Sequence, residues 1–276
     1  MGGTIGASLV RAGQEVVLVD RDRAHVEALN DRGLRITGPV DSFTVPVRAV
    51  VPEAVAGSVE LALLCVKSHH TREALDQLAP RLDDAGAIVS VQNGLCEHWI
   101  AERVGAERTV GAFVNYGADV LEPGVIHRGN RGATVVGELD GARTPRIVEI
   151  HRLFQIFEQD AVLTDNIFGY LWGKLAYAAL LFATASTPDS IADVLGDATL
   201  RPVLIPLARE AVAVARAHGV RPEAFDGFDP GAFAPGAPSS RAGASLDDLV
   251  RFNRASAKTH SGVWRDLAVR KRKTEV

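Results

Sequence analysis

The sequence has few cysteines, little net charge and no long apolar run. Two cysteines, Cys65 and Cys96, are too few for a disulfide framework and favour a reduced setting. A net charge of −4 gives no reason to expect a nucleic acid or an anionic membrane as partner. No basic segment followed by an apolar core opens the chain, and its longest apolar stretch, residues 175–185, is too short to span a membrane. We therefore expect a soluble, cytoplasmic protein.

The composition is that of an ordinary globular chain. Hydrophobic residues are 47% and charged residues 23% of the 276, enough for one large domain or two ordinary ones. Candidate strands and helices alternate up to residue 164, and no convincing strand follows Asp165. This pattern predicts an α/β, Rossmann-type dinucleotide-binding domain over 1–164 and an all-α domain over 165–276.

The periodicity predicts the individual elements. Short apolar runs are typical of strands and amphipathic runs of helices. Strands are expected at 34–36, 45–50, 60–66, 87–91, 110–114, 124–127, 133–136 and 161–164. The pieces within 109–136 are expected to complete one edge of the sheet with antiparallel pairing. Helices are expected at 21–32, 71–82, 145–159, 167–186, 200–218, 246–253 and from 260 to the end, with a loop over 226–243.

The first twenty residues form half of a known motif. Gly2, Gly3 and Gly6 open a helix that Gly13 ends, and the apolar run 16–19 leads to Asp20. Helix, glycine stop, strand and terminal acid make up the later part of a dinucleotide-binding βαβ unit, whose helix N-terminus binds phosphate. The strand and glycines that precede such a helix are absent, so an exposed sheet edge is expected beside 16–19. Alternatively, the glycines only allow close packing of the helix on a sheet.

Two residues after this strand bear on the choice of cofactor. Asp20 could accept a hydrogen bond from a ribose 2′-hydroxyl, which favours NAD. Arg21 could pair with a 2′-phosphate, which favours NADP. An equally plausible interpretation is that residues 21–23 are the solvated start of a helix.

Polar residues follow the next two predicted strands. Lys67 comes after the first of them, and Gln92, Asn93 and Gly94 come after the second. The carboxyl ends of strands in open α/β sheets face the ligand crevice, so Lys67 and Asn93 are candidate contacts for cofactor or substrate. The turn alone would also explain Asn-Gly. The adjacent histidines at 69 and 70 do not share a helical face, which argues against a metal site.

Lys174 is the most informative polar residue of the C-terminal half. It lies within a predicted helix that is apolar almost all round. Lysine is seldom fully buried without a partner. A functional role is favoured, because this helix opens the second domain, where it can face a cofactor cleft. The alternative is a lysine whose stem packs while its ammonium group reaches water.

Together these stretches resemble the ketopantoate reductase (2-dehydropantoate 2-reductase) family. Each match is weak by itself, but the ordered set is fairly specific. The matching pieces are Gly2-Gly3-Thr4-Ile5-Gly6, Val66-Lys67, Val91-Gln92-Asn93-Gly94-Leu95, Pro123-Gly124-Val125-Ile126-His127, Val136-Gly137-Glu138, Leu171-Trp172-Gly173-Lys174-Leu175 and Lys273-Thr274-Glu275.

The resemblance implies a Rossmann domain, a helical domain and NADPH-dependent reduction of a 2-oxo acid to a 2-hydroxy acid, as in the pantothenate pathway. Lys174 would be the catalytic lysine, and Glu275 the acid that holds a substrate hydroxyl or water near it. Lys67 and Asn93 would contact cofactor and substrate. Arg21 would bind the 2′-phosphate, which favours NADPH without excluding NADH. The implied partner is a small 2-oxo acid; a homodimer is left open.

Three departures from the family pattern are visible. Ala178 and Phe182 stand one and two turns beyond Lys174, where the family usually carries substrate-binding asparagines, and this favours a more hydrophobic 2-oxo acid. Ser261, a substrate contact that the resemblance implies, is one residue off the usual spacing to Glu275. The family also continues at both ends, so the chain looks truncated. The alternatives are a related dehydrogenase acting on a 3-hydroxy acid or a polyol, and a non-catalytic nucleotide-binding protein.

Overall fold

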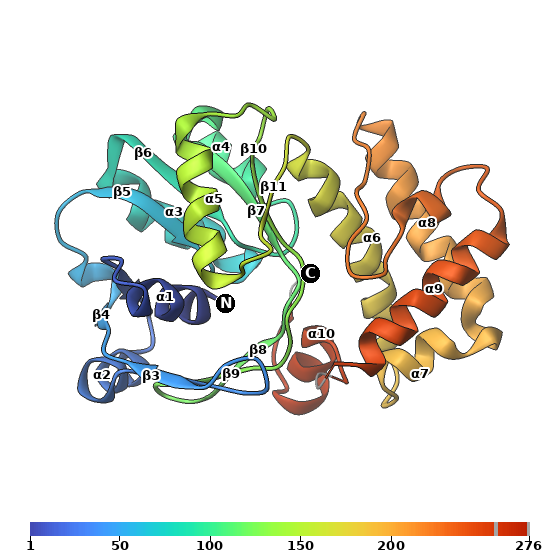
Figure 1. Cartoon of the computed structure of the whole chain (residues 1–276), viewed down its shortest axis with the longest axis horizontal. Coiled ribbons are helices and arrows are strands. Elements are labelled where there is room, and N and C mark those ends of the chain that lie inside the picture. The colour runs from blue at the N-terminus through green and yellow to red at the C-terminus, as the bar shows by residue number, and fades with distance from the viewer. Residues whose placement is uncertain (257–258, 275–276) are drawn as a thin grey trace. The chain divides into compact units, whose positions relative to one another are not determined.

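The computed structural model describes residues 1–256 and 259–274 and divides into two compact units (Figure 1). The first unit comprises Met1–Gln92 and Cys96–Asp165. The second comprises Asn93–Leu95 and Asn166–Val276. The short segment Asn93–Leu95 thus groups with the helical part, although it follows a strand of the first unit.

A five-stranded sheet forms the centre of the first unit. Its order is β11 (Val162–Leu163), β10 (Thr134–Glu138), β7 (Thr109–Val114), β6 (Leu82–Ser90) and β5 (Val59–Leu64). Strands β5, β6 and β7 are parallel, and β10 is antiparallel to β7. Strand β7 and the second half of β6 are buried throughout, whereas most of β5 is only partly buried. The predicted α/β fold and the antiparallel pairing at β10 are confirmed.

Two smaller sheets complete this unit. Strand β1 (Val17–Val19) pairs with β4 (Arg48–Val50) in parallel. A four-stranded sheet has the order β3 (Phe43–Val45), β2 (Leu34–Thr37), β9 (Val125–Arg128) and β8 (Ala118–Glu122). The prediction of one strand over 45–50 was wrong, because Pro46 has no N–H and separates β3 from β4. The prediction that 124–127 extends the main sheet was also wrong, since β9 pairs with β2 and β8.

The expected exposed edge is present at β1. Within the described residues, β1 pairs only with β4, and β5 pairs only with β6. The side chains of Val17 and Val19 are 40% and 49% exposed, which is high for valines in a strand. Both strands therefore present a backbone edge without a neighbouring strand.

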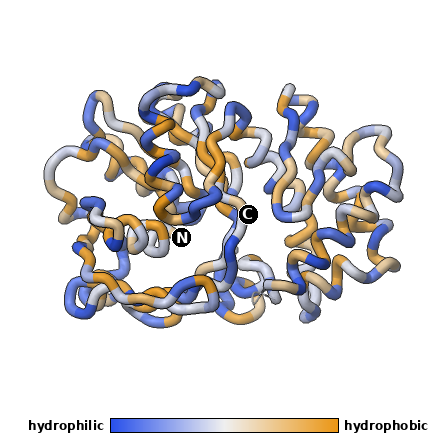
Figure 2. The backbone as a smooth tube through the Cα atoms, viewed as in Figure 1, coloured by the Kyte–Doolittle hydropathy of each residue, from blue (hydrophilic) through white to orange (hydrophobic). Residues whose placement is uncertain are grey.

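Helices of the first unit pack around these sheets. They are α1 (Gly2–Arg11), α2 (Arg23–Arg32), α3 (Thr71–Leu78), α4 (Glu97–Val104) and α5 (Pro145–Phe157). Helix α1 packs on α5, where Ile5 and Leu9 join Val110 and Phe154 in the main apolar core. In Figure 2 the tube alternates between hydrophobic and hydrophilic colours along α5, as expected for an amphipathic helix. Helix α4 was not predicted.

The second unit is helical. It contains α6 (Ile167–Thr184), α7 (Ile191–Gly196), α8 (Arg201–Ala217), α9 (Ser239–Arg254) and α10 (Gly262–Trp264), followed by a π-helical turn at Arg265–Val269. Helix α6 packs on α8, and α7 packs on α9. Two predictions were wrong: α9 begins inside the predicted loop, at Ser239, and the last helix ends at Val269. There the buried carboxylate of Asp266 binds the arginines at 270 and 272 and turns the chain.

Helix α6 is the one helix among the described residues that is long and apolar enough to cross a membrane. That finding rests on length and composition alone, and the core helix of a soluble protein passes the same test. The residues of α6 that are buried include Leu171, Ala176 and Leu180, on the side that packs within its own unit.

Candidate active site

The glycines of α1 allow its first turns to pack closely. A Cβ at Gly2 would lie 3.1 Å from Cβ of Cys65, the first residue after β5. A Cβ at Gly3 would lie 2.4 Å from Cδ1 of Ile126, and one at Gly6 would lie 2.6 Å from Cδ2 of Leu18. The packing interpretation of these glycines is therefore observed. Its consequence is that the N-terminus of α1 lies next to the loop that follows β5, where Lys67 is located.

Arg21 reaches the same loop. Its Nη2 lies 3.1 Å from Nε2 of His70, in the segment that joins β5 to α3. The start of α2 is formed by other residues, because Asp22 accepts a 3.2 Å hydrogen bond from the backbone N–H of His25 as the N-cap. Asp20 accepts a 2.9 Å hydrogen bond from the N–H of Asp22. Arg21 is thus a loop residue directed at His70. The sequence had argued against a metal site at this histidine and had indicated no other role for it.

The electrostatic setting of His70 follows from this contact. Burial and then the neighbouring Arg21 guanidinium lower the pKa of His70, and the carboxylate of Glu73 opposes them. The Nδ1 atom lies 3.6 Å from the Glu73 carboxylate. Because the pKa is lowered, the ring is predominantly neutral at pH 7.

Gln92 connects the ends of two parallel strands. The side chain is 5% exposed, and its Nε2 donates 2.8 Å hydrogen bonds to the Val66 carbonyl and to Oγ1 of Thr71. Thr71 in turn donates to the Ser68 carbonyl at 2.7 Å. These bonds fix the turn that carries Lys67. A buried amide directly after an apolar strand is the sequence signal that could have indicated this positioning role.

Lys174 and Asn93 meet within the second unit. The ammonium Nζ of Lys174, on α6, donates a 2.7 Å hydrogen bond to Oδ1 of Asn93. Helix α6 is fixed in rotation by the buried Tyr177, whose hydroxyl bonds Asn253 at 3.3 Å. Burial raises the pKa of Tyr177 to about 12, so this hydroxyl keeps its proton. This hydrogen bond therefore brings together Lys174 and Asn93, which are 81 positions apart in the sequence.

The remaining candidates of the C-terminal half have different surroundings. Phe182 is 39% exposed, which is unusual for phenylalanine, and Ala178 is half-buried. The hydroxyl of Ser261 is buried and accepts a 3.1 Å hydrogen bond from the N–H of Trp264, as the N-cap of α10. Ser261 therefore has a structural role that the sequence had not indicated. Glu275 lies outside the described residues.

The described residues contain no group of three or more His, Cys, Asp or Glu side chains arranged to hold a metal ion. Cys65 is also unsuited to nucleophilic chemistry, because burial raises the pKa of its thiol to about 11.

A Rossmann-type α/β unit followed by a helical unit that carries a lysine is typical of one class of NAD(P)-dependent oxidoreductases. The model of the family described as ketopantoate reductase PanE/ApbA matches residues 1–141. The chain belongs to this family.

Curated relatives agree with this assignment. The 2-dehydropantoate 2-reductase of Mesorhizobium japonicum is 28% identical over 247 residues, which cover 80% of this chain and 74% of the relative. The 2-dehydropantoate 2-reductase of Pyrococcus abyssi is 32% identical over 177 residues, covering 63% of this chain and 56% of the relative. The chain thus spans from about half to three quarters of the length of these relatives.

Solved structures share the fold. The 2-dehydropantoate 2-reductase of Geobacter metallireducens has a TM-score of 0.80 at 25% identity, covering 98% of this chain and 84% of that protein. D-mandelate dehydrogenase with NADH and anilino(oxo)acetate has a TM-score of 0.84 at 18% identity, covering 100% of this chain and 84% of that protein. At that identity, the second likeness supports the fold alone.

Proposed function

We propose that this protein reduces a 2-oxo acid to the corresponding 2-hydroxy acid with NADPH, in the manner of a 2-dehydropantoate 2-reductase. The hydrogen bond between Lys174 and Asn93 carries this proposal, because it fixes a proton donor on a helix. We also propose that the two units are a cofactor domain and a substrate domain, and that the enzyme is cytoplasmic. The family assignment favours an enzyme over a non-catalytic nucleotide-binding protein.

The residues of the first unit fit a dinucleotide. The N-terminus of α1 offers free N–H groups and a favourable dipole for pyrophosphate, and it lies beside the loop of Lys67. The Arg21 guanidinium, which lies next to His70, has the charge and planar donors that suit a 2′-phosphate. One carboxylate oxygen of Asp20 already accepts a hydrogen bond from the Asp22 N–H. Asp20 is therefore less available to accept a hydrogen bond from a ribose hydroxyl. This arrangement favours NADPH over NADH.

The residues of the second unit fit the chemistry of ketone reduction. A bound reduced nicotinamide would supply the hydride, which adds to the carbonyl carbon. The Lys174 ammonium would bond the ketone oxygen and transfer a proton to it as negative charge develops there. Asn93 would fix the direction of Nζ by accepting one of its N–H bonds. We further propose that Ala178 and Phe182 contact the substrate side chain.

A panel of 2-oxo acids with NADPH and with NADH tests the proposal. We expect NADPH oxidation that depends on the 2-oxo acid, with equimolar 2-hydroxy acid formed. A 3-oxo acid and an aldose would serve as controls for the related dehydrogenase activities. NADPH binding without turnover of any 2-oxo acid would contradict the proposed activity.

A further inference from the structure

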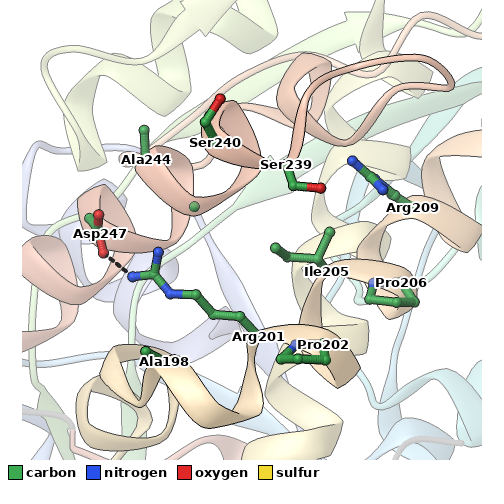
Figure 3. A pocket seen from close by; sticks show the side chains of 11 residues that line it. Ala198, Arg201, Pro202, Ile205, Pro206, Arg209, Ser239, Ser240, Ala244 and Asp247 are labelled. Atoms are coloured by element: carbon green, nitrogen blue, oxygen red, sulfur yellow. Dashed lines mark hydrogen bonds and ion pairs between the residues drawn. The ribbon is translucent and has the colours of Figure 1, made fainter.

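A second site-like feature lies wholly within the helical unit. A cavity of about 540 Å³ opens between α8 and the first half of α9 (Figure 3). Small-molecule sites have volumes of this order. None of Lys174, Asn93, Ala178 or Phe182 lines it. The cavity is therefore separate from the candidate active site.

Two arginines of α8 give the cavity its charge. Arg201 and Arg209 line it on either side of Ile205. Arg201 is paired with the carboxylate of Asp247, the one acidic residue of the lining. Arg209 donates a 2.8 Å hydrogen bond to the Ala237 carbonyl, and within the described residues it has no carboxylate partner. The lining thus retains one uncompensated positive charge.

Both guanidinium groups have unused hydrogen-bonding capacity. The Nε atoms of Arg201 and Arg209 are buried and have no hydrogen-bond partner among the described residues. Buried polar groups are normally paired, and an unpaired one costs free energy. A small shift of either side chain toward an acceptor in the cavity would remove that cost. The acceptor that suits a guanidinium fork best is an oxyanion.

Helix α9 adds donors on the opposite wall. It begins at Ser239, and the residue before it, Pro238, provides no side-chain cap for the first N–H groups. Ser239 and Ser240 line the cavity, and in Figure 3 the Ser239 hydroxyl is directed toward Arg209. The start of a 16-residue helix carries partial positive charge, so this end also favours an anion.

The facing side of α9 keeps the cavity open. Ser240, Gly243 and Ala244 are small and follow the spacing of one helical face. A Cβ at Gly243 would lie only 2.8 Å from Nη1 of Arg201. Glycine here lets the guanidinium lie against the helix. Small residues on one wall and arginines on the other leave a basic hollow.

We propose that this cavity binds a small oxyanion, the carboxylate or phosphate group of a metabolite, through Arg209, Arg201 and the N-terminus of α9. The site adds a binding function to the helical unit that does not depend on the proposed reaction.

Titration calorimetry at constant ionic strength tests this, with inorganic phosphate and succinate as separate probes. Ser240→Asp places a carboxylate at the second residue of α9, where it suits the helix dipole but repels an incoming anion. Arg209→Met removes the uncompensated charge. Arg216→Met removes an exposed arginine from the same helix, outside the cavity, and is the matched control.

We expect the wild type to bind at least one probe, and the first two variants to bind it about tenfold or more weakly, as for loss of a charge-assisted hydrogen bond. The control should bind as the wild type does. The stronger probe identifies the oxyanion. Absence of binding of both probes at millimolar concentration, or equal affinity in all three variants, would overturn the proposal. If Arg209→Met fails to fold, Ser240→Asp still decides the outcome.

Discussion

The Nζ atom of Lys174 lies 2.7 Å from Oδ1 of Asn93, although one residue belongs to an apolar helix and the other to the turn after a strand. The amide oxygen accepts from the ammonium group and thereby holds its direction. An arrangement of this kind suits a proton donor, because a fixed donor needs no reorganisation as the reaction proceeds. The proposed function rests on this pair.

Asn93→Ala should lower kcat by about 10–100-fold with a smaller change in KM, because the lysine remains but is no longer held in place. Steady-state kinetics with the best 2-oxo acid measures both constants. Asn93→Asp keeps an oxygen acceptor and should recover part of kcat. Equal kcat for the wild type and Asn93→Ala would remove Asn93 from the positioning of Lys174.

Arg21→Met should weaken NADPH binding by about tenfold or more and NADH binding much less, since only NADPH carries a 2′-phosphate. Fluorescence titration of both nucleotides measures the ratio. Arg23→Met is the matched control, because Arg23 is a neighbouring exposed arginine that pairs with Glu53 instead. Equal losses for the two nucleotides would rule out the 2′-phosphate role.

The affinity for NADPH should depend on pH through His70. In the free protein, burial and the Arg21 guanidinium lower the pKa of His70. A dianionic phosphate beside the ring would raise that pKa, so NADPH binding would take up a proton. Affinity should therefore increase as the pH falls from about 7.5 to about 5.5, more for NADPH than for NADH. Titrations across this range should show the effect in the wild type and not in His70→Gln. The same slope in both proteins would exclude His70 as its source.

Substrate preference should follow the apolar residues after Lys174. Ala178→Asn and Phe182→Asn place amides one and two turns beyond the lysine and should favour polar 2-oxo acids over apolar ones by about tenfold each. The ratio of kcat/KM for ketopantoate and an aromatic 2-oxo acid measures this. An unchanged ratio in both variants would separate these positions from the substrate side chain.

The first unit should depend strongly on a buried ion pair. Arg128 donates a 2.7 Å hydrogen bond to Glu158, and both side chains are about 5% exposed. Burial lowers the pKa of Arg128, so the charge it retains requires its partner. Glu158→Ala should destabilise the unit by about 3–5 kcal/mol in denaturant unfolding. Glu149→Ala breaks an exposed Glu–Arg pair and is the control, which should leave the unfolding midpoint essentially unchanged. A similar loss of unfolding free energy in both variants would contradict the claim that the buried pair stabilises the unit more than the exposed one.

The sequence predicted the main sheet better than its surroundings. The last four residues of β5 and most of the second half of β6 are apolar, and this concentration of apolar residues is what marked them as sheet strands. Helix α7 has only six residues, too few for a helical period to be visible. The start of α9 was predicted to be a loop because residues 226–243 are rich in proline and glycine, but the helix begins at Ser239, directly after Pro238.

Long-range contacts of the candidate site could not be predicted. Arg21 and His70 are 49 positions apart, and neither has a local pattern that indicates the other. The N-cap role of Ser261 depends on a three-residue helix that the sequence does not mark. Lys174 was identifiable because an ionisable residue in an apolar helix needs a partner, but the partner itself is set by the tertiary fold.

The most direct measurement is the rate of NADPH oxidation in a single turnover, with the best 2-oxo acid, for the wild type and Lys174→Ala. The account predicts a loss of several orders of magnitude in this rate with nearly unchanged NADPH affinity, because the lysine acts on the ketone oxygen and not on the nucleotide. A variant that turns over at the wild-type rate would contradict the proposed mechanism.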